Sequence, residues 1–313
     1  MSSLPNYRSE SLDHLGLVAG MCKQLGIADL VDRLIPPDSR CKATHGQRVV
    51  AMILNGLGFA SRTLYLSPEF LRNRPVQRLL GPGMQAGFFN DDALGRTLDA
   101  LHKHDVSQLY IAIAAHAVKI LGLPAAGLHM DSTSFHLDGK YNRDQPPDDD
   151  DRIIHVTRGH SRDHRPSLNQ IILHLIVENK AGIPLLMKAV SGNQIDKKAF
   201  KKTLDKHLTQ LQEAVPSDDL VADAALYTRE NIQALQGRIT FITRMPDSLR
   251  ETKRAIDVAL RSSLTPLPDT LSFLSLPTTY ADVLQRMVVV FSPDKLARDR
   301  GTLEKRVVKK SKE

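Results

Sequence analysis

The chain has 313 residues, of which 42% are hydrophobic and 25% are charged, values typical of a soluble globular protein with an apolar core. This length is room for two ordinary domains or one large one. No run of about 18 apolar residues occurs, and the first residues lack the apolar segment of a secretory signal. Cys22 and Cys41 cannot form a zinc site alone. As free thiols they fit a reducing cytoplasm, where we expect the protein.

The formal net charge of +7 fits a polyanionic partner, although many basic proteins bind no nucleic acid. The basic residues of the tail 301–313 outnumber its two acids, Glu304 and Glu313. A solvated helix face and a DNA contact are both open interpretations of this tail.

Residues up to about Leu123 follow a helical pattern. Apolar residues recur at helical spacing from Leu12 to Leu34, where Pro36-Pro37 ends the segment. Further helices are predicted over 47–60 and over 106–121 from their apolar residues. Two more are predicted to begin at Ser67-Pro68-Glu69 and at Asn90-Asp91-Asp92, where a capping side chain, an early proline or early acids favour the start of a helix.

After Leu123 the pattern becomes β-rich. Strands are predicted over 127–137 and 153–157, and the runs 169–178 and 183–190 flank Asn179-Lys180-Ala181-Gly182, which indicates a hairpin. Helix and strand then alternate: a helix over 195–211, a strand over 220–222, a helix over 228–235 and a strand over 239–243. A helix to about Leu260, a strand over 287–291 and a basic helix complete the chain. This order favours an α/β fold, a mixed sheet covered by helices.

Two acids stand where strands are predicted. Asp131 lies inside an otherwise apolar strand, where burying a carboxylate is costly unless it is paired or bound to metal. Asp223 follows a strand directly, at the end where α/β sheets place their ligands. Two such carboxylates can hold divalent cations. From spacing alone, a turn or cap role for Asp223 and an exposed edge-strand position for Asp131 remain open.

Eight stretches of the chain carry a family resemblance: LDHLGLVAGMCKQLGI, VVAMILNGLGFASRTLYL, LLGPGMQAGFFNDDALGRTLDAL, LHMDSTSFHLDG, GHSRDHRPSLNQIILHLI, GIPLLMKAVSGNQIDKKAF, LVADAALYTRENIQAL and ITFITRMPDSLRETK. In this order they resemble one group of bacterial insertion-sequence transposases. These belong to the metal-dependent, three-carboxylate (DDE) class with a late Tyr-Arg-Glu-Lys signature. The resemblance covers essentially the whole chain.

The resemblance implies a ribonuclease-H-like mixed sheet with flanking helices, preceded by an all-α N-terminal domain. It implies three parts: a helical domain for DNA end recognition over 1–123, a catalytic domain over 124–246, and a linker with the start of an inserted region over 247–313. Asp131, in LHMDSTSF, and Asp223, in LVADAALY, would be the first two catalytic, metal-binding acids. Mg²⁺ or Mn²⁺ would be the cofactor, duplex DNA at element ends the substrate, and a homo-oligomer the assembly, with no membrane.

One departure from the family pattern limits this expectation. No Y-x-x-R-x-x-x-E spacing follows Asp223, Tyr227 and Glu230 are too close to it, and Glu304 falls in a matched linker segment. We therefore expect the third acid to be absent, the chain to be truncated before the signature, and catalysis by the chain alone to be incomplete. The alternative function is a DNA-binding, regulatory protein that retains end binding or subunit pairing.

Other chemistry-bearing residues are weaker candidates. His155, His160, Asp163 and His164 resemble a metal cluster, but Gly159 and Pro166 mark a loop, and polar packing or proximity to DNA is the better interpretation. The arginines of that loop could meet phosphates or remain solvated. Ser132 and Ser134 lack a visible base. No phosphate-binding loop or dinucleotide fingerprint occurs, and 5% aromatic residues argue against a base-stacking platform.

Overall fold

The structure is a computed structural model, and it describes residues 10, 12–58, 62–123, 127–139, 141, 153–160, 165–194 and 196–311. The chain divides into two compact units. Unit 1 comprises Met1–Gln194 with Lys206–Ser217, and unit 2 comprises Ile195–Asp205 with Asp218–Glu313. The predicted domain boundaries at 123 and 246 stay predictions.

Unit 1 begins with three helices, α1 (Leu15–Gln24), α2 (Ile27–Leu34) and α3 (His45–Gly56). The apolar periodicity predicted one continuous segment from Leu12 to Leu34, but Gly26, with φ +61°, separates α1 from α2. Only a residue without a Cβ adopts that backbone cheaply, and the helix ends there. At the start of α3, Thr44 and Gln47 form a reciprocal capping box.

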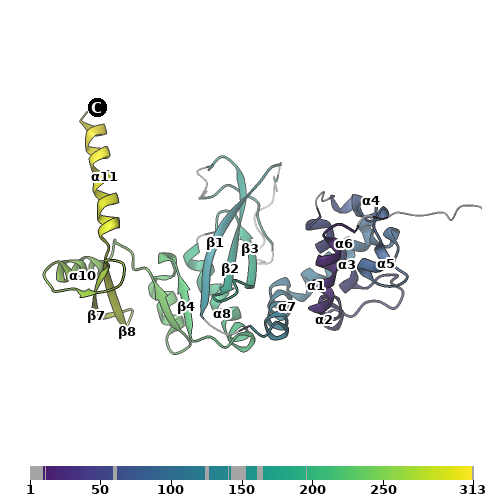
Figure 1. The fold of residues 1–313 in the computed structure, drawn as a ribbon, viewed down its shortest axis with the longest axis horizontal. Coiled ribbons are helices and arrows are strands. Elements are labelled where there is room, and N and C mark those ends of the chain that lie inside the picture. The colour runs from purple at the N-terminus through teal and green to yellow at the C-terminus, as the bar shows by residue number, and fades with distance from the viewer. Residues whose placement is uncertain are drawn as a thin grey trace, which may run out of the picture. The chain divides into compact units, whose positions relative to one another are not determined.

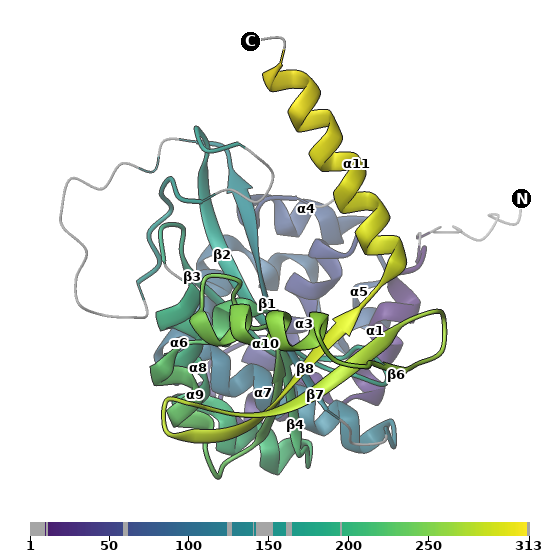
Figure 2. The same cartoon turned by 90° about the vertical axis from the view of Figure 1, so that its left-hand side faces the viewer.

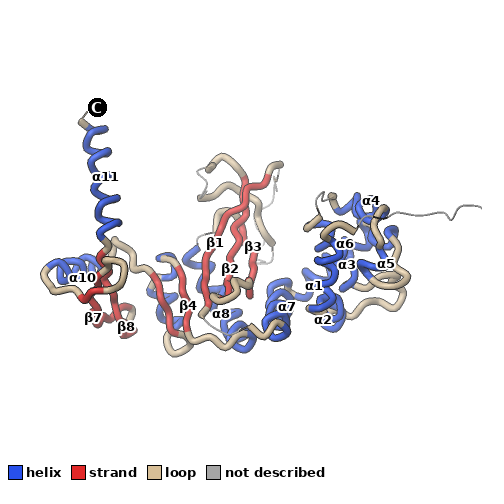
Figure 3. The backbone as a smooth tube through the Cα atoms, in the orientation of Figure 1, coloured by secondary structure: helices blue, strands red, loops and turns tan. Residues whose placement is uncertain are grey.

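Helices continue through the rest of the region before Leu123, which contains no strand among its described residues (Figure 3). They are η1 (Leu64–Leu66), α4 (Ser67–Arg72), α5 (Val76–Leu80), η2 (Ala86–Phe89), α6 (Asp91–His104) and α7 (Val106–Ile120). Asn90 caps α6 as predicted, since its Oδ1 accepts a hydrogen bond from the backbone N–H of Ala93 at 2.9 Å. Ser67 lies inside α4 and makes no capping bond, so its predicted capping role is wrong.

The helices of this region enclose an apolar core in which the largest fully buried side chains come from different helices. Gly46 shows how closely two of them approach. A Cβ at Gly46 would collide with the backbone of Ala28 in α2, and the Gly46 N–H donates to Asp32 Oδ1 at 2.7 Å. The side chain of Asp32 thereby satisfies one of the unpaired amides at the start of α3.

Three antiparallel strands follow in unit 1: β1 (Leu128–Leu137), β2 (Asn169–Glu178) and β3 (Pro184–Ser191). The β2–β3 hairpin is confirmed, and Glu178 holds its turn by accepting from the N–H groups of Lys180 (2.5 Å) and Ala181 (2.8 Å). Along β2, buried and half-buried residues alternate, the period of a strand with one covered face. Helices α7 and α8 (Asp196–Ala214) follow the predicted pattern, and α7 packs on β3.

The strand predicted over 153–157 does not form. Only Thr157 pairs with β2, through an isolated bridge to Gln170. The apolar pattern of Ile153 to Thr157 therefore reflects packing of a loop whose residues are half-buried.

Unit 2 contains a parallel pair, β4 (Asp219–Ala222) and β5 (Thr240–Thr243), connected through η3 (Ala224–Leu226) and α9 (Arg229–Leu235). Helix α10 (Arg250–Leu260) then packs on a second sheet, β6 (Thr265–Pro266), β7 (Ser272–Tyr280) and β8 (Val283–Phe291), as Figures 1 and 2 show. The last helix is α11 (Pro293–Lys310). With antiparallel and parallel pairs and many helices, the chain has the predicted α/β class of fold.

Strand β7 was not predicted, because Pro277 interrupts its pattern. Proline cannot donate to a ladder and is confined to strand edges. Here β6 pairs only with Phe273 and Ser272, so β7 has an open edge at Pro277.

Candidate functional site

Asp131 lies on the exposed face of β1. Its neighbours Met130 and Ser132 point into the protein and are 2% and 3% exposed, whereas Asp131 is exposed and its cross-strand partner is Leu175. Asp131 Oδ1 accepts from the N–H of Ser132 at 2.7 Å. The predicted cost of burying this carboxylate therefore does not arise, because the pleat directs its side chain to solvent. Accessibility, rather than burial, is what makes Asp131 available to a ligand.

Asp223 follows β4 at the carboxyl end of the parallel pair, and it belongs to unit 2 whereas Asp131 belongs to unit 1. Its Oδ1 accepts from the N–H of Ala225 at 2.9 Å, and its carbonyl accepts from Thr243 Oγ1 at 2.6 Å. Asp223 is thus the N-cap of η3, as one of the two interpretations of the sequence expected. Its side chain is exposed, and Oδ2 makes no hydrogen bond to a described residue.

Tyr227, four residues after Asp223, is a structural anchor of unit 2. Its ring stacks on Tyr280 with centroids 4.8 Å apart, and its hydroxyl donates to Gln285 Oε1 at 2.9 Å. Burial, with smaller contributions from Tyr280 and Glu251, raises the pKa of Tyr227 to about 12. This phenol therefore stays neutral through the physiological range and joins the segment after Asp223 to the β7–β8 hairpin.

The histidine-rich loop is described only in part, since Asp163 and His164 lie outside the described residues. His155 is half-buried, its N–H donates to Ser191 Oγ at 3.0 Å, and its carbonyl accepts from the N–H of Gly192 at 3.0 Å. Across the described ranges, no group of three or more His, Cys, Asp or Glu side chains could hold a metal ion. For His155, polar packing of the loop is what the structure shows.

Sequence reasoning missed the contact that fixes this loop. A Cβ at Gly192 would collide with the carbonyl oxygens of Gln170 and Thr157, and a Cβ at Gly159 would collide with the carbonyl of Gly192. The fully buried Gln170 side chain donates to the carbonyls of Gly192 (2.8 Å) and His160 (3.2 Å). We call these residues, Gly159, Gln170 and Gly192, the glycine junction. Two glycines 33 positions apart carry no sequence signal of being neighbours.

A row of polar side chains crosses the covered face of the β1–β2–β3 sheet, opposite to Asp131. The register pairs Ser132 with His174 and His174 with Lys188, and Ser132 and His174 are 3% and 0% exposed. Burial lowers the pKa of the Lys188 ammonium, and the ammonium of Lys206 in α8 lowers it further.

His207 of α8 lies near Lys188 and Lys206 and is also fully buried. Burial lowers the pKa of its imidazole, and the charges of Lys206 and Lys188 add to that shift. Lys206 itself pairs with Asp105, at 2.6 Å. No sequence pattern indicated this buried cluster, because its members lie on four separate elements.

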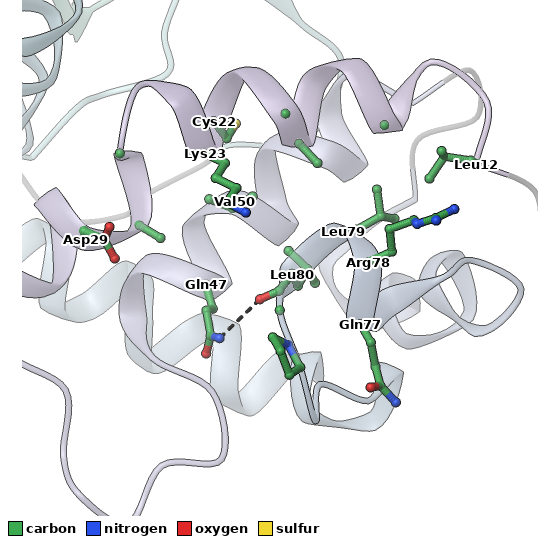
Figure 4. A pocket seen from close by; sticks show the side chains of 17 residues that line it. Leu12, Cys22, Lys23, Asp29, Gln47, Val50, Gln77, Arg78, Leu79 and Leu80 are labelled. Atoms are coloured by element: carbon green, nitrogen blue, oxygen red, sulfur yellow. Dashed lines mark hydrogen bonds between the residues drawn. The ribbon is translucent and has the colours of Figure 1, made fainter. Parts of the chain in front are cut away.

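The helical region contains a pocket of about 510 Å³ bounded by α1, α2, α3 and α5 (Figure 4). Gln47 lies in its wall; its amide N–H donates to the carbonyl of Leu80 at 3.2 Å, and its Oε1 accepts from the N–H of Thr44 at 2.9 Å. Cys22 is buried there, which raises the pKa of its thiol. Cys22 and Cys41 are both free cysteines.

These features define a helical region followed by an α/β arrangement with two accessible carboxylates, one on a strand and one at a strand end. A family model described as a domain of unknown function, DUF4277, matches residues 7–115. No curated protein matches the chain. Among the described residues, no helix is both long and apolar enough to cross a membrane.

Two solved structures resemble the chain at low similarity. The piggyBac transposase, in its synaptic complex with hairpin DNA, has 12% identity and a TM-score of 0.31, with coverage of 92% of this chain and 54% of that one. The Mos1 transposase, in a paired-end complex with the left transposon end, has 10% identity and a TM-score of 0.26, with coverage of 82% and 92%. The present chain thus spans about half of the piggyBac protein, and both TM-scores are too low to establish a shared fold.

Proposed function

We propose that the chain is a transposase-type protein of the DDE class, with a ribonuclease-H-like sheet, that carries out metal-dependent phosphodiester hydrolysis and strand transfer at the ends of a DNA element. The proposal is carried by Asp131 and Asp223, which sit in two of the eight matched stretches and are both exposed carboxylates, the second at the carboxyl end of a parallel strand. That end is where α/β sheets place their ligands.

The donor chemistry of these residues fits a divalent cation such as Mg²⁺ or Mn²⁺. Both ions prefer carboxylate oxygens, and Asp223 Oδ2 has no hydrogen bond to a described residue. Asp131 and Asp223 would hold the cations, whose chemistry would be to stabilise negative charge on phosphate oxygens. The residues of the chain would hold and orient the cations, Asp131 from a rigid strand and Asp223 from the capped turn η3.

The test is a titration with Mn²⁺, followed by calorimetry or by the electron paramagnetic resonance of the free ion. We expect the chain to bind Mn²⁺ weakly, and we expect Asp131→Asn and Asp223→Asn each to reduce that affinity. The double variant should lower the Mn²⁺ affinity no further than the single variant with the larger effect. Asp138→Asn and Asp219→Asn are matched controls, because Asp138 follows the same strand β1 and Asp219 starts β4, and both are exposed. Binding that survives both site variants would refute the metal role.

A second candidate function is DNA binding without chemistry. It is favoured by the capping bond that Asp223 accepts from the N–H of Ala225, which gives this acid a structural role. Salt-sensitive binding to a duplex, together with no Mn²⁺ binding, would select this function over the first. Phosphate neutralisation makes log affinity fall linearly with log salt.

A further inference from the structure

Helix α11 has a side-chain cap at its start and basic residues in its last turn, yet it buries none of its side chains. Ser292 caps it by accepting from the N–H of Lys295 at 3.3 Å, Pro293 occupies its first turn, and Lys309 and Lys310 lie in its last turn. Proline at the start and cations at the end favour a helix locally. A helix of this length with no covered face gains nothing from packing within the chain, so its exposed faces are available to a partner.

The side chains of α11 separate into two faces. Arg298, Thr302, Lys305 and Lys309 follow the spacing i, i+4, i+7, i+11, which places them on one side of a helix. We call these four residues the basic face. Figures 1 and 2 show α11 as one uninterrupted helix, so the spacing holds over its whole length. At 1.5 Å per residue, Lys305 and Lys309 are about 6 Å apart along the axis, and Arg298 and Lys305 about 10 Å.

The cations of the basic face make no ion pair with a described residue. Among the described residues, the one ion pair of α11 joins Lys295 and Asp299 at 3.1 Å. These two residues lie beside the basic face and are not part of it. The guanidinium of Arg298 donates to the backbone carbonyl of Asp294 at 3.4 Å, and Thr302 donates to the carbonyl of Arg298 at 2.9 Å. Three positive charges that make no ion pair with a described residue lie in line, and together they form an electrostatic surface for a polyanion.

We propose that the basic face of α11 binds the phosphate backbone of duplex DNA. The choice of DNA rests on the proposed function, and the contact with phosphates rests on the charges themselves. Arginine and lysine side chains on one helix face can each meet a phosphate, and such contacts position a protein without reading sequence. This is a second DNA contact, in unit 2, additional to any contact made by the helical region before Leu123.

A membrane surface fits α11 less well than DNA does. The opposite face carries Leu296, Leu303 and Val307, of which the last two are 62% and 58% exposed. Arg300 interrupts this apolar row at the same helical spacing, and the helix has no aromatic residue. Helices that lie in a membrane surface present a continuous apolar face, often with Trp or Phe.

The experiment measures binding of the whole chain to a labelled 30-base-pair duplex at several salt concentrations by fluorescence anisotropy. The variant replaces Arg298, Lys305 and Lys309 by Gln. Its matched control replaces Lys253, Arg254 and Arg261 by Gln, which removes the same charge from exposed positions in and just after α10. We expect the α11 variant to lower affinity at least about tenfold near 0.1 M salt, and to make the slope of log affinity against log salt shallower by roughly 2.7.

The outcomes of this DNA-binding experiment can be distinguished from those of the Mn²⁺ titration that tests the proposed function. Equal affinity and slope for wild type and α11 variant, with DNA binding retained, would overturn the inference and leave the proposed function standing. Loss of Mn²⁺ binding is confined to the Asp131 and Asp223 variants, and the α11 variant should bind Mn²⁺ as wild type does. A different result would also overturn the inference: the chain binds anionic phospholipid vesicles, the double variant Leu303→Ser, Val307→Ser loses that binding, and no variant changes DNA binding.

Discussion

Two pairs of adjacent non-glycine residues adopt left-handed backbone angles in the turns of the β6–β7–β8 sheet. Asp269 and Thr270 have φ of 59° and 62°, and Ala281 and Asp282 have φ of 54° and 63°. Two such residues in succession make the type I′ turn, whose twist suits a two-residue hairpin and which usually carries Asn-Gly. A β-branched residue such as Thr270 adopts that conformation only with steric strain.

Replacing Thr270 by Gly should therefore raise the free energy of unfolding by about 1 kcal/mol, because the left-handed strain disappears and Thr270 is exposed. The measurement is the urea concentration at the midpoint of unfolding. Thr270→Val is the comparison variant and should lower that midpoint. A Thr270→Gly variant less stable than wild type would show that the turn has other backbone angles.

At the glycine junction, glycine is required because no space is left for a Cβ atom. Gly192→Ala should lower the free energy of unfolding by about 2 to 3 kcal/mol, since the added methyl meets the backbone carbonyls of Gln170 and Thr157. Gly95→Ala is the control. Gly95 lies inside α6, and a methyl group added there would have nothing within 4 Å, so alanine should stabilise by up to about 1 kcal/mol. Equal effects of the two substitutions, measured by thermal unfolding, would contradict the close approach.

Among the secondary-structure elements, the second half of α8 contains a buried titratable group, His207. His207 and Leu208 are fully buried, and Lys188 of β3 and Lys206 lie close to the imidazole, with Asp105 paired to Lys206. Burial, with the charges of Lys206 and Lys188, lowers the pKa of this imidazole. A positive charge there is opposed both by desolvation and by its neighbours.

The lowered pKa of His207 predicts acid sensitivity. A folded-state pKa below the unfolded value of 6.5 means that the unfolded chain binds the proton more readily. The contribution of His207 to stability is therefore complete above about pH 6.5 and is lost as the pH falls through the folded-state pKa. His207→Gln should flatten the decline of the urea midpoint with acidification, whereas His102→Gln, at an exposed position of α6, should leave it unchanged. An unaltered slope in His207→Gln would contradict this.

For the molecule as a whole, the proposed function depends on the approach of two acids from different units, Asp131 in β1 and Asp223 after β4. We predict that β1 and β4 lie side by side in one sheet and that both carboxylates bind one pair of cations about 4 Å apart. The measurement is an experimental structure with Mn²⁺ bound. Carboxyl groups more than about 10 Å apart are beyond the reach of bridging oxygen ligands and would exclude the shared site.

Local pattern was enough for much of the fold. Apolar periodicity predicted α3, α7, α8 and α10, alternating hydrophobicity and a polar turn predicted the β2–β3 hairpin, and Asn90 marked the start of α6. These features depend on residues within a few positions of one another. Both site acids were likewise located on a strand and at a strand end from sequence.

Residue order alone thus specified the helical region, the change to an α/β pattern after Leu123 and the positions of the two acids along their strands. It took the folded chain to establish that Asp131 faces solvent, that Gly159 and Gly192 meet, and that β7 pairs with β8 across Pro277. Each of these depends on which distant segment covers a face, occupies a space or leaves an edge open. Those contacts join residues far apart in the chain, and local periodicity carries no information about them.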